Sequence, residues 1–147
     1  PPANRVNAAV AAEHKPEQLK ACETATLLAR INNEWASVCF FYSAYRAVRC
    51  AFNNDERLNS DAAARDVNAK LSVSSRHIDF HNGHPNRGPG VNDVVRILYP
   101  AIAAEYELLH TKSVEVRYRT GLIGLSIEQT KGLADAIIGE LDGRGLL

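Results

Sequence analysis

The sequence predicts an all-α, up-and-down bundle of four to five helices. Apolar residues recur at steps of three and four over most of the chain, and no stretch alternates with period two over a useful length. Clusters of turn-forming residues separate the periodic stretches. With 147 residues, the chain is long enough to bury one full core. We therefore expect a single helical domain spanning residues 1–147.

Residues 34–52, EWASVCFFYSAYRAVRCAF, are predicted to form the central helix. One apolar set at helical spacing comprises Trp35, Val38, Tyr42, Tyr45 and Phe52, and a second set comprises Phe41, Ala44, Val48 and Ala51. A helix that is apolar over this much of its surface must be covered from several sides. We therefore expect Tyr42 to be buried and Trp35 to stand at the start of the helix.

The segment before residue 34 is predicted to hold two helices. Residues 1–14 are rich in alanine and favour a short helix. Pro16 is expected to start a second helix that reaches about residue 31, because its missing N–H costs nothing in the first turn. The predicted buried stripe of this helix is Leu19, Cys22, Thr26 and Ala29. The pair Asn32-Asn33 makes a tight connection to an antiparallel central helix.

The polar run after Phe52 is expected to be a loop. Ser60 or Asp61 is predicted to cap a short helix that ends near residue 72, with Val67 and Leu71 as its apolar anchors. The following residues 81–90, HNGHPNRGPG, contain three Gly, two Pro and two Asn. This density of turn formers excludes regular structure and indicates a functional or mobile loop.

A long helical pattern follows the glycine-rich loop. Apolar residues at steps of three and four run from Val91 to Val116, and Pro100 inside this stretch predicts a kink. Gly121 and Gly124 are expected to end the helix. Ser126, with Gln129 three residues later, forms the capping box of a last helix over about 127–141.

Composition limits the classes of function. The 17 basic and 17 acidic side chains cancel, so no global field attracts nucleic acid or anionic lipid, and contact with nucleic acid has to be local. The odd set of three cysteines, Cys22, Cys39 and Cys50, is typical of small apolar side chains in a reducing compartment. No run is long enough to span a bilayer, and no signal-peptide pattern opens the chain. We expect a soluble cytoplasmic protein.

The segment richest in candidate catalytic side chains is RHIDFHNGH, residues 76–84. It holds three of the five histidines. One interpretation is a metal site, because His77 and His81 share a helix face at a spacing of four and His84 or Asp79 would add a ligand. A purely structural role, in which these side chains bind carbonyls and carboxylates, is a second interpretation.

RNA cleavage without a metal is the third interpretation of this segment. The reaction needs a group that takes the proton of the 2′-hydroxyl and a cation that stabilises charge on the phosphate. Histidine and arginine supply these roles near neutral pH. Arg76 and His81, with four residues between them, are positioned to act on one phosphate within one chain or across a dimer axis.

Three stretches resemble the HEPN superfamily of small helical bundles from prokaryotes, and the resemblance covers most of residues 16–141. EWASVCFFYSAYRAVRCAF is similar to a HEPN helix in which a Trp-Ala start precedes an aromatic-Tyr-Ser-Ala stretch. LYPAIAAEYELLHTKSVEVRYRTG resembles the long C-terminal helix of an uncharacterised HEPN branch, where the matching residues are Tyr106, Leu109, Ser113, Arg117 and Tyr118. A closing helix such as SIEQTKGLADAIIGEL also occurs in that branch.

The resemblance implies a bundle that dimerises and, in active members, cleaves RNA without metal or cofactor. The family's signature is an Arg followed, after four to six residues, by a His, and Arg76 with His81 has this spacing. In this sequence the pair lies before the glycine-rich loop and not at the start of the long helix. The implied function is a toxin-like endoribonuclease in stress response or defence. The expected substrate-binding residues are His77, His84, Arg87, Asn92 and Arg96.

An inactive interaction module is the alternative function, with the chain acting as a dimerisation or partner-binding scaffold. A homodimer is expected, and the aromatics Phe40, Phe41 and Tyr45 exceed what one small core requires. The positions of Arg76 and His81 distinguish the two functions. Facing each other at a symmetric groove, they favour the nuclease, whereas separate salt bridges favour the scaffold.

Overall fold

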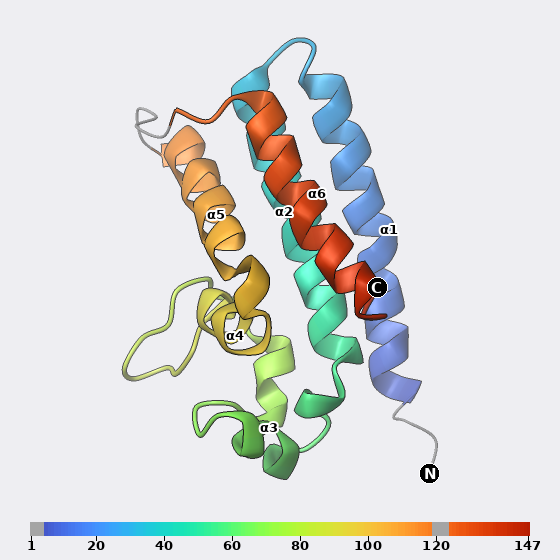
Figure 1. Ribbon diagram of the computed structural model, residues 1–147, viewed down its shortest axis with the longest axis vertical. Coiled ribbons are helices and arrows are strands. Elements are labelled where there is room, and N and C mark those ends of the chain that lie inside the picture. The colour runs from blue at the N-terminus through green and yellow to red at the C-terminus, as the bar shows by residue number, and fades with distance from the viewer. Residues whose placement is uncertain (1–4, 119–123) are drawn as a thin grey trace.

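The computed structural model describes residues 5–118 and 124–147, which form six α-helices and no strand (Figure 1). The α-helices are α1 (Arg5–Leu28), α2 (Asn33–Asn54), α3 (Asp61–Val67), α4 (Val91–Leu98), α5 (Ala103–Tyr118) and α6 (Ile127–Gly143). The four long helices α1, α2, α5 and α6 lie along the long axis, whereas the short α3 and α4 lie together at one end (Figure 1). The all-α prediction is confirmed, but the described residues form six α-helices where four to five were predicted. None of the described helices is long and apolar enough to cross a membrane.

Helix α2 is largely buried, as predicted, but the position of Tyr42 was predicted wrongly. Phe41 and Phe52 are fully buried, whereas the Tyr42 side chain is 37% exposed and Trp35 in the first turn is 51% exposed. Tyr42 lies at the edge of the contact between α2 and α5, where its hydroxyl accepts a hydrogen bond from Arg117. A tyrosine tolerates this half-open position because its ring packs while its hydroxyl stays polar.

A single helix, α1, replaces the two helices predicted before residue 34. Pro16 lies inside α1 and does not start a helix. Pro16 and Ala12 are both exposed, so the carbonyl that loses its backbone donor faces solvent. The predicted stripe is also wrong, since Leu19 is 52% exposed. The buried residues of α1 are instead Ala11, Gln18 and Ala25.

The connection between α1 and α2 follows the prediction. The Asn32 side chain accepts a hydrogen bond from the Trp35 backbone N–H and caps α2. Further along the pair, Gln18 donates to the Ser43 hydroxyl at 3.2 Å, and that hydroxyl donates to the Gln18 carbonyl at 3.1 Å. These reciprocal bonds fix the register of two antiparallel helices.

The segment between α2 and the glycine-rich loop is less helical than predicted. Ser60 caps α3 as expected, but α3 ends at Val67, whose side chain is 40% exposed, while Leu71 beyond the helix is buried. Two short 3-10 helices, Glu56–Leu58 and Val73–His77, flank α3. The chain therefore buries Leu71 from an irregular segment.

The α-helix is interrupted next to Pro100, where a kink within one helix was predicted. Helix α4 ends at Leu98, Tyr99 leaves helical geometry with φ −131° and ψ 59°, and a 3-10 turn Pro100–Ile102 leads into α5. The apolar face is retained across the break, because Leu98, Ile102 and the residues that follow are buried. The predicted end at Gly121 lies outside the described residues.

Helix α6 confirms the predicted capping box. The Ser126 hydroxyl accepts from the Gln129 N–H at 3.1 Å, and the Gln129 side chain accepts from the Ser126 N–H at 2.9 Å. Ala134, Ile137 and Leu141 pack into the core shared with α2 and α5.

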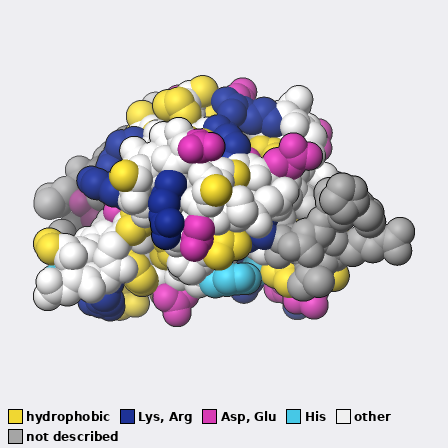
Figure 2. Space-filling view, turned by 90° about the horizontal axis from the view of Figure 1, so that it is seen from below, with side chains coloured by type: hydrophobic (Ala, Val, Ile, Leu, Met, Phe, Trp, Pro, Cys, Tyr) yellow, Lys and Arg dark blue, Asp and Glu magenta, His cyan; other side chains and the backbone are white. Residues whose placement is uncertain are grey.

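The surface assignments made from sequence need one correction. Phe40 and Phe41 are buried in the core of their own chain, so they are not a partner surface. The three cysteines carry no disulfide. In the view from the α3 end, basic and acidic side chains are intermixed over the surface, in line with the neutral composition (Figure 2).

Candidate functional site

The start of the glycine-rich loop is held against the first turn of α4. The Val91 N–H donates to the Phe80 carbonyl at 3.0 Å, and the Asn92 N–H donates to the His81 carbonyl at 2.9 Å. Gly90 is buried here, and a Cβ on it would collide with backbone atoms of His81 and its neighbours. Glycine is therefore required for the close approach that fixes His81.

The His81 ring packs against a second histidine, His110 of α5, with the ring planes tilted by 35°. Their ring centroids lie 4.4 Å apart. Both rings also contact Phe41 of α2, at 5.5 Å for His81 and 5.2 Å for His110, and His81 contacts the Tyr45 ring at 5.4 Å. The aromatic face of α2 thus brings together two imidazoles from distant parts of the chain.

Asn92 orients His110. Its side-chain nitrogen Nδ2 donates to Asn82 Oδ1 at 3.0 Å and lies 3.1 Å from His110 Nδ1. Because Nδ2 is a donor, Nδ1 of His110 accepts, and the proton of the neutral ring is on Nε2. This contact orients the His110 ring and assigns its proton to Nε2.

Two arginines border the histidine pair. Arg117 of α5 donates to the Tyr42 hydroxyl at 3.2 Å, and Arg49 of α2 donates to the Tyr45 hydroxyl at 3.4 Å and to the carbonyl of Ile78. Neither guanidinium has a carboxylate partner among the ion pairs of the described residues. Positive charge therefore gathers at this edge of a neutral molecule.

The surroundings lower the pKa of both histidines. Burial is the main cause of the lowered pKa of His81, and the charges of Arg117 and Arg49 add to it. Burial, His81 and Arg117 together lower the pKa of His110 to about 4. Both rings are then neutral at pH 7. A bound anion would raise both pKa values by cancelling the arginine charges.

Arg76, predicted as the catalytic cation, has different neighbours from His81. Its side chain is 2% exposed, and its guanidinium donates to the carbonyl of Asp55 at 3.5 Å and to the side chain of Asn59. Burial lowers the pKa of Arg76. These contacts connect Arg76 to the turn after α2, whereas His81 contacts α2 and α5.

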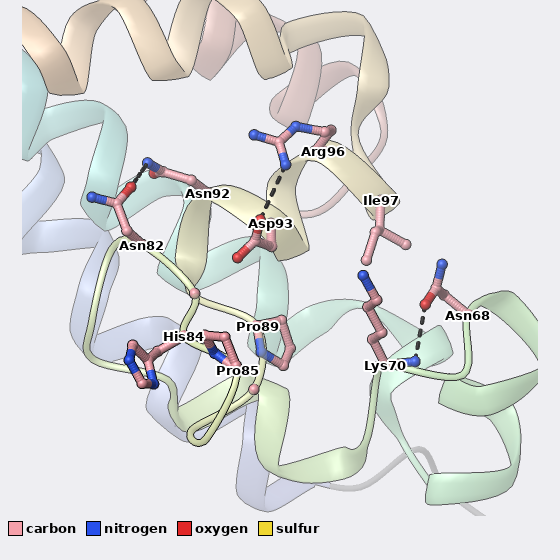
Figure 3. A pocket seen from close by; sticks show the side chains of 12 residues that line it. Asn68, Lys70, Asn82, His84, Pro85, Pro89, Asn92, Asp93, Arg96 and Ile97 are labelled. Atoms are coloured by element: carbon pink, nitrogen blue, oxygen red, sulfur yellow. Dashed lines mark hydrogen bonds and ion pairs between the residues drawn. The ribbon is translucent and has the colours of Figure 1, made fainter.

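Three of the predicted substrate-binding residues line one pocket of about 810 Å³ beside the loop: His84, Asn92 and Arg96 (Figure 3). Arg96 is paired with Asp93 and with Glu107. The other two predicted residues do not line this pocket. His77 is exposed at the end of a 3-10 helix, and Arg87 lies over the Phe80 ring at 5.5 Å.

A smaller pocket of about 230 Å³ adjoins the large one, and neither His81 nor Arg117 is among the residues that line these two pockets. His110 lines the smaller pocket, which shares Asn82, Asn92 and Arg96 with the pocket of Figure 3. Among residues 5–118 and 124–147, no group of three or more His, Cys, Asp and Glu side chains could hold a metal ion. The metal-site interpretation of His77 and His81 with His84 or Asp79 therefore has no ligand set in the described residues.

Sequence reasoning missed His110 and Arg49 and assigned Arg117 no chemical role. His110 directly follows Leu109 on the buried face of α5, and its side chain is only 6% exposed. The signal in the sequence that could have identified His110 is a histidine placed on an otherwise apolar helix face. Arg117 was noticed only through the HEPN resemblance.

A comparison of the chain with protein-family models, with curated proteins and with solved structures gives no match.

Proposed function

We propose that this protein is a HEPN-like endoribonuclease that cleaves RNA without a metal, and that His81, His110 and Arg117 form its site. The observation that carries the proposal is the pair of neutral imidazoles with ring centroids 4.4 Å apart. Arginine charge lies beside this pair, and one of its members, His110, lines a pocket. Acid–base side chains with perturbed pKa values in a concave site are typical of catalysis.

The proposed reaction uses the 2′-hydroxyl of RNA as the nucleophile. His81 takes the hydroxyl proton, since its lowered pKa leaves the ring free to accept a proton at pH 7. The 2′-oxygen then attacks phosphorus and the bond from phosphorus to the 5′-oxygen of the next nucleotide breaks, which leaves a 2′,3′-cyclic phosphate. The departing 5′-oxygen takes a proton from water, and protonated His81 returns its proton to the solvent. Arg117 stabilises the charge on the phosphoryl oxygens, and the Nε2–H of His110 donates to one of them.

This proposal retains the function predicted from sequence but assigns the role of the catalytic cation to Arg117 in place of Arg76. The buried hydrogen bonds of Arg76 support a structural role for that residue, while Arg117 contributes positive charge at both histidines. The proposed setting, from the HEPN resemblance, is a cytoplasmic toxin-like activity in stress response or defence.

The test is cleavage of a mixed-sequence single-stranded RNA by purified protein in the presence of a chelator. His81→Gln is expected to reduce the rate by roughly a hundredfold or more, and Arg117→Gln is expected to act similarly. His77→Gln, which changes an exposed histidine away from the pocket, is the matched control. Thermal melts show that the variants are folded. No cleavage by the parent protein, or equal loss in the control, would contradict the proposal.

A second candidate is the interaction module, and one surface favours it. Leu27, Ile31 and Trp35 surround the turn between α1 and α2, with exposed fractions of 66%, 82% and 51%. Single exposed apolar residues are common, but three at one turn are typical of an interface. We propose this turn as the contact between two copies of the chain.

Light scattering at micromolar concentration tests the second candidate. The parent protein is expected to be a dimer, and Ile31→Glu is expected to be a monomer of unchanged helicity. Val73→Glu, which changes an apolar residue exposed elsewhere (39%), is the control. A monomeric parent protein would remove this candidate and leave the single-chain site of His81 and His110 intact.

A further inference from the structure

The large pocket in Figure 3 adjoins the small pocket that His110 lines, and it has no role in the proposed chemistry. Three elements form it: the glycine-rich loop, the outer face of α4 and the segment after α3 (Figure 3). At about 810 Å³ it falls within the range of ligand sites, which is roughly 300–1,000 Å³. We propose that it binds the nucleotide next to the scissile phosphate, so that the substrate is single-stranded RNA. This inference rests on the proposed function.

The position of the pocket supports this assignment. Asn82, Asn92 and Arg96 line both the large pocket and the small one that contains His110. A chain with its phosphate at His110 and Arg117 would therefore pass Asn82 on its way into the large pocket.

The walls of the pocket suit a flat base. Pro85 and Pro89 from the loop and Ile97 from α4 supply apolar surface (Figure 3). Single-stranded bases are bound between such surfaces and read at their edges, which a paired base cannot present. Asn68 and Asn82 provide these edge contacts. Each uses its Oδ1 as an acceptor within the protein and keeps an NH₂ group for a ligand.

The side chain of Lys70 places a positive charge at the side of the pocket formed by the segment after α3. Lys70 lies on the segment after α3, and its ammonium points toward Ile97 across the pocket (Figure 3). Arg96 is already paired with Asp93 and Glu107, whereas the ion pairs of the described residues do not include Lys70. Lys70 is thus the cation available for the next phosphate of the strand.

The experiment measures binding of a short single-stranded RNA whose 2′-hydroxyls are methylated, so that binding is separated from cleavage. Lys70→Ala is expected to weaken binding about tenfold and to reduce the salt dependence by about one ion. Lys20→Ala, which changes an exposed lysine on α1, is expected to leave both unchanged. Amide NMR shifts on addition of mononucleotides are expected at Gly83, Gly88 and Ile97.

The outcomes separate this inference from the nuclease proposal. If His81→Gln abolishes cleavage while Lys70→Ala leaves binding unchanged, the pocket assignment is wrong and the nuclease proposal stands. If the methylated RNA binds as expected but unmodified RNA is never cleaved, the pocket binds nucleotides and the nuclease proposal fails. Equal binding of a duplex of the same sequence, or shifts caused by polyglutamate and not by nucleotides, would overturn the inference.

Discussion

The rings of His81 and His110 pack against each other with centroids 4.4 Å apart and planes tilted by 35°, and both imidazoles lie against the ring of Phe41. Two neutral rings tolerate this arrangement, but a proton on one of them adds a charge beside Arg117. The pair is therefore a site at which pH, ligand charge and stability are linked.

The first prediction concerns stability against pH. The pKa of His110 is about 4 in the folded protein and near 6.5 in the unfolded chain, so between these pH values the unfolded chain binds the proton more readily. The stabilisation is fully present above pH 6.5 and is lost as pH falls toward 4. It amounts to at most about 3 kcal/mol. Denaturant unfolding of His110→Gln between pH 4 and 8 should give a flatter profile than the parent.

The second prediction concerns Asn92. Replacing its amide by a carboxylate in Asn92→Asp places a negative charge 3.1 Å from His110 Nδ1. An opposite charge favours the protonated ring, so the pKa of His110 should rise well above its present value of about 4. NMR titration of the His110 ring protons measures it. An unchanged pKa would show that Asn92 does not contact Nδ1, and Asn86→Asp, in the exposed loop, serves as the control.

The third prediction compares two neighbouring aromatic residues. Phe41 is fully buried, so Phe41→Ala should lower the unfolding free energy by roughly 3–5 kcal/mol. Tyr42 is 37% exposed, and Tyr42→Ala should cost roughly 1–2 kcal/mol because less surface is lost from the core. Urea denaturation of the two variants decides the order. Equal costs would contradict the burial of Phe41 against the two histidines.

The fourth prediction concerns the buried carboxylate of Asp55 and its hydrogen bonds. Its carboxylate accepts hydrogen bonds from Arg57, at 2.7 Å for Nη2, and from the Tyr99 hydroxyl at 2.9 Å. Burial alone would raise the pKa of Asp55, but these bonds lower it below its ordinary value. Asp55→Asn should therefore cost roughly 3 kcal/mol at pH 7. The stabilisation should be lost as pH falls below 3.8. Asp66→Asn, at an exposed site, should change the thermal midpoint little.

The fifth prediction concerns two glycines. In Gly90→Ala the new methyl group would collide with the loop backbone, so the bonds that hold Val91 and Asn92 should weaken. Hydrogen exchange at these two amides should become faster, and the contact between the His81 and His110 rings should loosen. Gly132→Ala in α6 meets no atom within 4 Å and should stabilise the helix by roughly 0.5–1 kcal/mol. Slow exchange at Val91 in Gly90→Ala would contradict the role of this glycine.

Local signals along the chain were enough to predict several of the helices. Helical periodicity placed α2 and the face from Val91 onward, and the capping pair Ser126 and Gln129 marked the start of α6. These features depend on residues within one or two turns of each other. Pro16 was misjudged because a proline with an exposed neighbouring carbonyl is tolerated inside a long helix, and only packing against α2 shows which side of α1 is exposed.

Which residues form the candidate site depends instead on long-range packing. Spacing paired Arg76 with His81, but the packing of the turn after α2 buried Arg76, and the aromatic face of α2 brought His110 to His81. Which rings meet across three segments depends on helix register and on the contact of Gly90 with the loop backbone. A pattern within nine residues cannot encode these long-range relationships, because they are set by packing of the whole bundle.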